Sequence, residues 1–268
     1  MRIVFRCDPA LEPYLPRPVP AREALPRWLA DMPRQALSDA HAMDVRTVKH
    51  CPPFIDAMSH GFIMPLPCDV RVEDGALAWD WDIPAPAARS HPRSPISFHA
   101  SAQVEGTPLQ AQGQVIVKFN SFWTIELEPG WSLFATHPLN RPDLPFTTLS
   151  GLVDADRFHD VGILFPAVWR DRGFSGLLPR GTPVAQCFAV PRDAPELVFA
   201  ALDQDGVKGY DAAAQALLGG PGVYRKQFRA PRLRPRLCPG SERGPEPGEI
   251  EPQPPDRGGD DRLGDPPE

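Results

Sequence analysis

Two carboxylates spaced two residues apart are the side chains in this sequence that best fit acid–base chemistry. Asp154 and Asp156 follow the apolar pair Leu152-Val153 closely. In an extended chain, residues i and i+2 project from the same face, so we expect the two side chains to lie side by side if the strand continues through them. Neighbouring carboxylates raise one another's pKa, which suits one of them to proton abstraction. The spacing is typical of a pair in which one of the two carboxylates acts as a general base.

The same segment has a second interpretation. His159 and Asp160 follow closely, so a hard cation could bind this group of residues through its carboxylates. Aspartates at strand ends, however, commonly cap turns through hydrogen bonds to the backbone. The residues favour turn capping, and no metal site is predicted.

A polar loop at residues 137–143 is the next candidate. Asn140 and Arg141 in this loop could recognise an anion, since functional loops are often of this kind. The alternative is a turn stiffened by the neighbouring prolines, with Asn140 in left-handed geometry. The residue types favour the turn.

The elements that must position these residues are mainly β-strands. The chain has 36 prolines in 268 residues, about 13% against a usual ~5%. Proline is excluded from helix interiors and central strands, which favours many short strands with irregular connections. We therefore expect a β-sandwich or a partly closed barrel with a few short peripheral helices.

Individual elements follow from local patterns. Residues 70–81 predict a hairpin, because Asp74-Gly75 is a preferred type I′ turn pair. Residues 114–119 and 122–127 are expected to pair in one sheet. Further strands are expected at residues 131–136, 146–153, 161–165 and 184–190. Short helices are expected at residues 21–32, 53–58 and 209–220.

Composition limits the possible partners. The net charge of −6 gives no basis for a broad nucleic-acid surface. No run of apolar residues approaches the length of a membrane span, and the N-terminal apolar run is too short for a signal peptide. The five cysteines are scattered without a Cys-x-x-Cys pair, which is typical of reduced and mostly buried thiols. We expect a cytoplasmic protein without membrane partners.

The chain divides into two parts by composition. Residues 1–230 are expected to form a single β-rich domain. Residues 231–268 are rich in proline, glycine and charge and contain hardly an aliphatic side chain. Such a segment cannot bury enough apolar surface to offset the entropy of ordering, so we predict a disordered tail.

Several motifs in order resemble a family of tailed-phage and bacterial proteins that has no established activity. The resemblance covers about residues 1–230 and is carried by segments 47–56, 61–69, 118–125, 129–132, 137–141 and 150–156. It implies a phage or prophage association and supplies little mechanism.

A narrower resemblance concerns two consecutive motifs. Gly151-Leu-Val-Asp-Ala-Asp, followed by a strand and then Pro179-Arg-Gly-Thr-Pro-Val-Ala-Gln, is similar to motifs of the dUTPase and dCTP-deaminase superfamily. The resemblance implies a β-clip fold, a compact jelly-roll-like barrel whose members commonly form trimers. It also implies that Asp154 activates water and that an aromatic residue stacks on the nucleotide base.

The chain departs from that superfamily in several positions. Arg157 stands in the place of the stacking aromatic residue, and Phe158 comes one residue late. A Pro-Arg-Ser-Gly phosphate cradle and the glycine-rich C-terminal motif are missing from the sequence. Arg157, Arg141 or Arg180 would have to replace that cradle, and magnesium would be needed only if the chain is such an enzyme.

Two functions follow from these observations. The first is a phage- or prophage-associated β-domain that binds or assembles, with a homo-oligomer as one form of assembly, and that has no catalysis, cofactor or known small-molecule ligand. The alternative is a divergent dUTPase-like nucleotide-binding enzyme or nucleotide pyrophosphohydrolase. In that enzyme Asp154 and Asp156 are catalytic, and Phe158, Asn140, Arg141 and Arg180 bind the ligand.

The tail generates the first testable prediction. Deleting residues 231–268 should leave the melting temperature nearly unchanged, because the tail contributes no apolar burial. Differential scanning calorimetry of the full and truncated chains measures the difference. A drop of several degrees, or amide protection within the tail, would show that it docks.

Overall fold

The computed structural model describes residues 1–109 and 116–231 and is built mainly of β-strands. Within these ranges it has sixteen strands, and all their pairings are antiparallel. This confirms the mainly β class. A compact unit spans Met1–Phe228. The predicted tail at residues 231–268 lies, except for its first residue, outside the described residues.

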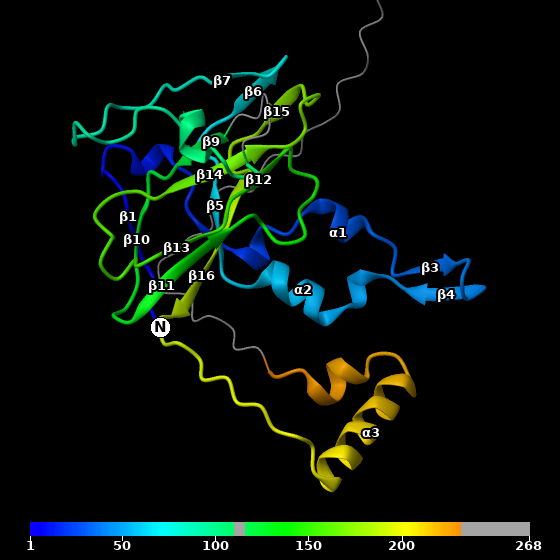
Figure 1. Ribbon diagram of the computed structural model, residues 1–268. Helices are drawn as coiled ribbons and strands as arrows, with labels where there is room; N and C mark the ends of the chain where they lie inside the picture. The colour runs from blue at the N-terminus through cyan, green and yellow to red at the C-terminus, as the bar shows by residue number, and fades with distance from the viewer. Residues whose placement is uncertain (110–115, 232–268) are drawn as a thin grey trace, which may run out of the picture. The chain divides into compact units, whose positions relative to one another are not determined.

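Two larger sheets organise the strands (Figure 1). The five-stranded sheet has the order β13 (Gly151–Val153), β11 (Trp131–Thr136), β16 (Pro183–Pro191), β5 (Phe62–Pro65), β2 (Val19–Pro20). The four-stranded sheet has the order β12 (Phe146–Thr148), β14 (Leu164–Trp169), β9 (Ile116–Asn120), β8 (Ile96–Phe98). In the five-stranded sheet β16 is the middle strand.

Three smaller sheets and a few helices complete the described residues. The sheets are β15-β6-β7 (Gly176–Leu178, Val70–Glu73, Ala76–Ala78), β1-β10 (Val4–Arg6, Thr124–Glu126) and β3-β4 (Gln35–Ser38, Met43–Arg46). The α-helices are α1 (Arg27–Asp31), α2 (Pro52–Ser59) and α3 (Gln204–Leu218), and a π-helical turn covers Tyr224–Phe228. Short 3-10 turns cover Glu12–Tyr14, Ala21–Glu23, Val48–His50 and Ser101–Val104.

The two larger sheets contribute to one apolar core. On β11, Leu133 and Ala135 are buried while Phe134 between them is only half-buried, as alternation along a strand requires. The four-stranded sheet supplies Phe119 and Phe146, whose ring centroids lie 4.7 Å apart. Burying such rings stabilises the fold by about 1.5–3 kcal/mol each. The core therefore holds together segments far apart in the sequence.

The hairpin predicted at residues 70–81 is present as β6 and β7. Asp74 and Gly75 both have positive φ, 49° and 79°, which is the geometry of a type I′ turn. β7 ends at Ala78, so the hairpin is shorter than the pattern predicts. Trp79 and Trp81, which follow it, pack against the core.

The three predicted helices are present with shifted bounds. α1 occupies only the second half of residues 21–32, and α2 covers the predicted 53–58. α3 begins five residues earlier than expected, because Asp203 caps it by accepting a hydrogen bond from the Gly206 N–H at 2.7 Å. Gly206 and Gly209 lower the helix propensity of these first turns, so the sequence pattern did not predict that the helix begins here.

The predicted pairing of residues 114–119 with 122–127 is wrong. Residues 114 and 115 lie outside the described residues, but β9 pairs with β14 and β8, whereas β10 pairs with β1. Between the two strands, Ser121, Phe122 and Trp123 are buried in succession, which an alternating hairpin does not allow. The chain instead turns a corner here, with the Trp123 indole donating to the Pro16 carbonyl at 3.0 Å.

Other predicted strands are changed in extent. Residues 146–153 form two strands rather than one: β12 belongs to the four-stranded sheet and β13 to the five-stranded sheet. The strand expected at 161–165 begins at Leu164 and continues to Trp169. The strands expected at 131–136 and 184–190 are confirmed as β11 and β16.

Two further sequence expectations concern thiols and membranes. Among the described cysteines, Cys187 is buried and Cys7, Cys51 and Cys68 are half-buried, all without a disulfide. Cys238 lies outside the described residues. In the described part of the chain, every helix is too short or too polar to cross a bilayer.

The glycine that follows α2 gives a test of the packing between β5 and β16. Gly61 has φ +72°, and a Cβ there would stand 2.1 Å from the Cys187 carbonyl oxygen. Gly61→Ala should therefore destabilise the fold by about 3 kcal/mol or more, since strain and overlap with backbone add. Urea unfolding followed by tryptophan fluorescence measures the change.

Gly130→Ala is the matched control. Gly130 also has a positive φ, +88°, but a Cβ there would meet nothing within 4 Å. It should cost only the ~1–2 kcal/mol of left-handed backbone strain. Equal destabilisation by the two variants would contradict the close approach of Gly61 to β16.

Candidate functional site

Asp154 and Asp156 lie in a turn and not in a strand. β13 ends at Val153, and the N–H groups of Arg157 and Phe158 both donate to the Asp154 carbonyl, at 2.9 and 2.8 Å. The expectation that the strand continues through the two aspartates is therefore wrong. Their side chains are brought together by something else.

Arg192 holds the two carboxylates. Its guanidinium donates to Asp156 Oδ1 at 2.7 Å and also binds Asp156 Oδ2, and its Nη1 lies 3.2 Å from Asp154 Oδ1. The Gly130 N–H donates to Asp156 Oδ2 at 3.1 Å, and the Ser132 hydroxyl donates to Asp154 Oδ1 at 2.7 Å. The Asp156 side chain is only 6% exposed, whereas that of Asp154 is 58% exposed. We call these residues, Ser132, Asp154, Asp156 and Arg192, the Arg192 cluster.

The electrostatics of the Arg192 cluster contradict the predicted rise in pKa. Hydrogen bonds from Arg192 lower the pKa of Asp156 to about 2. The hydrogen bond from Ser132, followed by that from Arg192, lowers the pKa of Asp154, and the repulsion between the two aspartates is the weaker influence. A general base works best when its pKa lies near the working pH. Both groups are instead stabilised as carboxylates, through both oxygens of Asp156 and through Oδ1 of Asp154.

The cluster does not fit a magnesium ion either. Mg²⁺ is bound through carboxylate oxygens that are free to face it. Both oxygens of Asp156 already accept hydrogen bonds from Arg192, which also places a positive charge where the cation would lie. In the described ranges, no group of three or more His, Cys, Asp and Glu side chains is arranged to hold a metal.

Phe158 and the loop at 137–143 are not part of the Arg192 cluster. Phe158 lies at the end of the aspartate turn, with half of its surface exposed. Asn140 has φ 57°, the left-handed geometry of the alternative interpretation. Arg141 is committed to Asp143 through Nε and Nη2 at 2.8 Å each, and Asp143 also accepts from the Trp28 indole at 3.3 Å. The guanidinium of Arg141 therefore already has an anionic partner.

Arg180 lies at the opposite end of β16 from the Arg192 cluster. Its backbone N–H donates to Asp69 Oδ1 at 2.6 Å. Its side chain borders an open hollow of about 410 Å³, together with Arg71, Trp79 and Asp80. β16 has nine residues, and at ~3.3 Å per residue it separates the two ends by roughly 30 Å. Within one chain, Arg180 is therefore too far from Asp154 to bind a phosphate whose water Asp154 activates.

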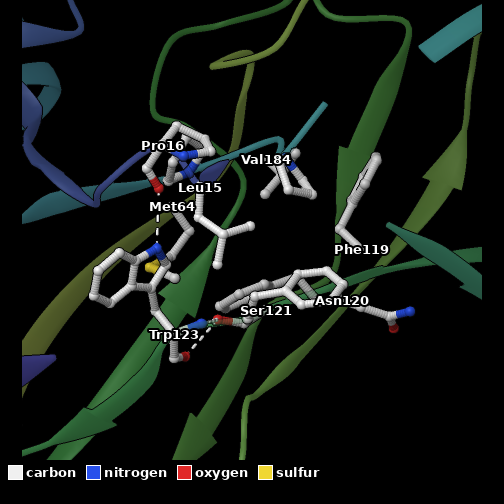
Figure 2. Close-up of a pocket in the computed structure, with 12 residues that line it drawn as sticks. Leu15, Pro16, Met64, Phe119, Asn120, Ser121, Trp123 and Val184 are labelled. Carbon is white, nitrogen blue, oxygen red and sulfur yellow. Dashed lines mark hydrogen bonds between the residues drawn. The ribbon is translucent and has the colours of Figure 1, made fainter. Parts of the chain in front are cut away.

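A second space lies inside the core, between Met64, Phe119, Trp123 and Val184 (Figure 2). Figure 2 shows Trp123 and Met64 on one side of this space and Val184 and Phe119 on the other, with Leu15 among them. The space measures about 10 Å³, which is about one water molecule. It is a packing defect of the core and too small for a ligand.

Gln186, like Arg192, is a polar residue whose role the sequence analysis did not predict. Its side chain is 1% exposed, and its amide donates to the carbonyls of Ala57 at 2.9 Å and His60 at 2.7 Å. Its Oε1 accepts from the Leu139 N–H at 2.8 Å. Gln186 therefore fastens the end of α2 and the 137–143 loop to β16. The available signal was a glutamine within the apolar strand pattern of residues 184–190.

The sequence was compared with protein-family models and with curated proteins. No protein-family model matches the sequence, and no curated protein matches it. The two family resemblances therefore stay predictions.

The Arg192 cluster predicts a pH-dependent contribution to stability. The pKa of Asp156 is about 2 in the folded chain, below the ~3.9 of an unperturbed aspartate. The cluster therefore stabilises the fold above pH ~4, and that stabilisation is lost as the pH falls through about 2. Arg192→Gln should lower the melting temperature at pH 7, and the difference from the parent chain should shrink between pH 4 and 2.

Arg17→Gln is the control for this series. Arg17 pairs with Glu12 at 2.9 Å in an exposed ion pair, which contributes little to stability. The melting temperature of Arg17→Gln should equal that of the parent chain at every pH. If Arg192→Gln followed the parent chain in the same way, the cluster would have no structural role.

Proposed function

We propose that this chain is a non-catalytic β-domain that acts through binding, in an assembly of the kind that tailed phages and prophages encode. The observation that carries the proposal is the engagement of both candidate catalytic carboxylates by Arg192. With lowered pKa values and an ion pair to Arg192, Asp154 and Asp156 support the fold better than they support proton transfer.

The face of the β15-β6-β7 sheet supports a binding role. Arg71 lies opposite Leu177 on one side and Ala78 on the other, so the three residues cross the same face of the sheet. Leu177 is half exposed, and the half-buried Trp79 borders the same hollow. Small-molecule sites combine apolar surface with a few placed polar groups. This surface would suit a partner with an apolar body and charges of both signs.

The proposal includes a β-clip or jelly-roll arrangement and a homo-oligomer. The shared core beneath the five- and four-stranded sheets supports a layered β-structure of this type. The superfamily resemblance implies a trimer, in which a non-catalytic domain presents its loops in several copies.

The competing enzyme has less support. A dUTPase-like mechanism needs Asp154 as base, Phe158 on the nucleotide base and an arginine at the phosphates. Arg141 is bound to Asp143, and Arg180 lies at the far end of β16. Of the three candidate arginines, only the exposed Arg157 therefore remains near Asp154. Fold resemblance alone does not carry an activity.

Turnover and molar mass together test the proposal. The full chain is incubated with dUTP or dCTP and magnesium, and released pyrophosphate and phosphate are measured. We expect no release above a protein-free control, because the carboxylates are already engaged. We also expect light scattering to give three times the 29.5 kDa mass of the chain.

Asp154→Asn provides the decisive comparison. Nucleotide hydrolysis by the parent chain that disappears in Asp154→Asn would overturn the proposal and establish the enzyme. Hydrolysis that persists equally in the variant would indicate a contaminant, since the proposal assigns turnover to no residue. A strict monomer would contradict the oligomeric part.

A further inference from the structure

Besides the hollow beside Arg180, the structure has a second hollow, which is surrounded by positive charge. Its lining residues are far from Asp154 in the sequence. It measures about 380 Å³ and lies between the base of the β3-β4 hairpin and the segment 221–226. The hairpin side contributes Arg34, Gln35 and Arg46, and the opposite wall contributes Arg225 and Lys226. The imidazole of His50 completes the rim. Among the described residues that line this hollow there is no carboxylate.

Backbone contacts fix the hairpin side of this cationic hollow. Gln35 and Arg46 are directly opposite in the β3-β4 register. At the base of the hairpin, the Thr47 hydroxyl donates to the Pro33 carbonyl at 2.7 Å and its N–H to the Arg34 carbonyl at 3.1 Å. The base of the hairpin therefore fixes the backbone at Arg46 in β4 and at Arg34, which directly precedes β3.

A glycine brings the second wall close. Gly222 has φ +83°, and a Cβ at this position would stand 3.4 Å from the Arg46 guanidinium. The Lys226 N–H donates to the Gly222 carbonyl at 3.2 Å, which turns the chain so that Arg225 and Lys226 follow at the rim. Two segments far apart in the sequence thus present their cations to one space.

The four cationic side chains have no counter-charge among residues 1–109 and 116–231. Arg34, Arg46, Arg225 and Lys226 make no side-chain hydrogen bond or ion pair with another described residue. Lys49, three residues beyond Arg46, differs: its ammonium donates to the carbonyls of Ala30 at 2.6 Å and Met32 at 2.9 Å. Like charges gathered without a partner repel one another, and a bound anion would relieve that repulsion.

We propose that this cationic hollow binds a small molecule carrying two or three phosphates. Arginine guanidinium groups match phosphate oxygens in fork geometry, and three of the four cations here are arginines. A volume of about 380 Å³ admits a polyphosphate chain with a small organic group. The net charge of −6 opposes binding of a long nucleic acid over the rest of the surface. The proposal is independent of the non-catalytic role argued above.

Calorimetric titration of the full chain with inorganic tripolyphosphate at low salt tests the site. We expect one equivalent to bind, with an affinity that falls at least tenfold when NaCl is raised to 0.5 M, because exposed charges are screened. Arg46→Glu and Arg225→Glu, one from each wall, should each weaken binding about tenfold or more.

Arg89→Glu is the matched control, because it makes the same change of charge at an exposed arginine outside the hollow. It should leave the affinity within about twofold of the parent chain. Circular dichroism and melting temperature verify that each variant is folded. If the glutamate variants are unstable, Arg46→Gln and Arg225→Gln give the same test with a smaller expected loss.

Titrations with other phosphate-bearing ligands show which kind of molecule the hollow binds. ATP should bind with the same sensitivity to Arg46→Glu, and binding of ATP without tripolyphosphate would overturn the proposal. Absence of tripolyphosphate binding at low salt would overturn it, as would binding that Arg89→Glu weakens as much as Arg46→Glu. Duplex DNA that binds more tightly than tripolyphosphate would also overturn it. Asp154→Asn should leave this binding intact, so failure here is distinct from failure of the proposed function.

Discussion

The buried amide of Gln186 is the constraint on which much of the five-stranded sheet depends. An amide removed from water costs several kcal/mol unless its donors and acceptor are paired. Gln186 meets this requirement with carbonyls at the end of α2 and an N–H in the 137–143 loop. Because these partners precede it by 47 to 129 residues, the amide is satisfied only when the strands around β16 are in place. It therefore specifies the arrangement as well as stabilising it.

The same central strand, β16, separates polar residues that the sequence analysis assigned to one ligand site: Asp154 and Asp156 on one side, Arg180 on the other. One end of β16 leads into Arg192 and its two aspartates, and the other follows Arg180. A spacing of two carboxylates predicts acid–base chemistry only when nothing else binds them. Here Arg192, which follows β16, forms ion pairs with both aspartates, and the two carboxylates stabilise the end of the sheet. The chemical meaning of the motif is thus decided by a residue outside it.

Local patterns predicted local structure well and long-range structure poorly. The Asp74-Gly75 turn and strand β11 follow from residues adjacent in the chain, and both are confirmed. The pairing of β9 with β10 was wrong because buried side chains at consecutive positions turn the chain into another sheet. The roles of Arg192 and of the cationic hollow depend on residues brought together only by folding. No spacing in the sequence marks such sites.

The antiparallel pairing of β5 with β16 also governs how the chain must be made. His60 and Gln186, which join across this pairing, are separated by 126 positions. At ribosomal rates of ~5–20 residues per second, β5 waits about 6–25 s for its partner. During that interval Phe62, Ile63 and Met64, all buried in the finished fold, have no neighbouring strand on that side. The nascent chain therefore passes through a stage in which an apolar strand edge is open to chaperones and to aggregation.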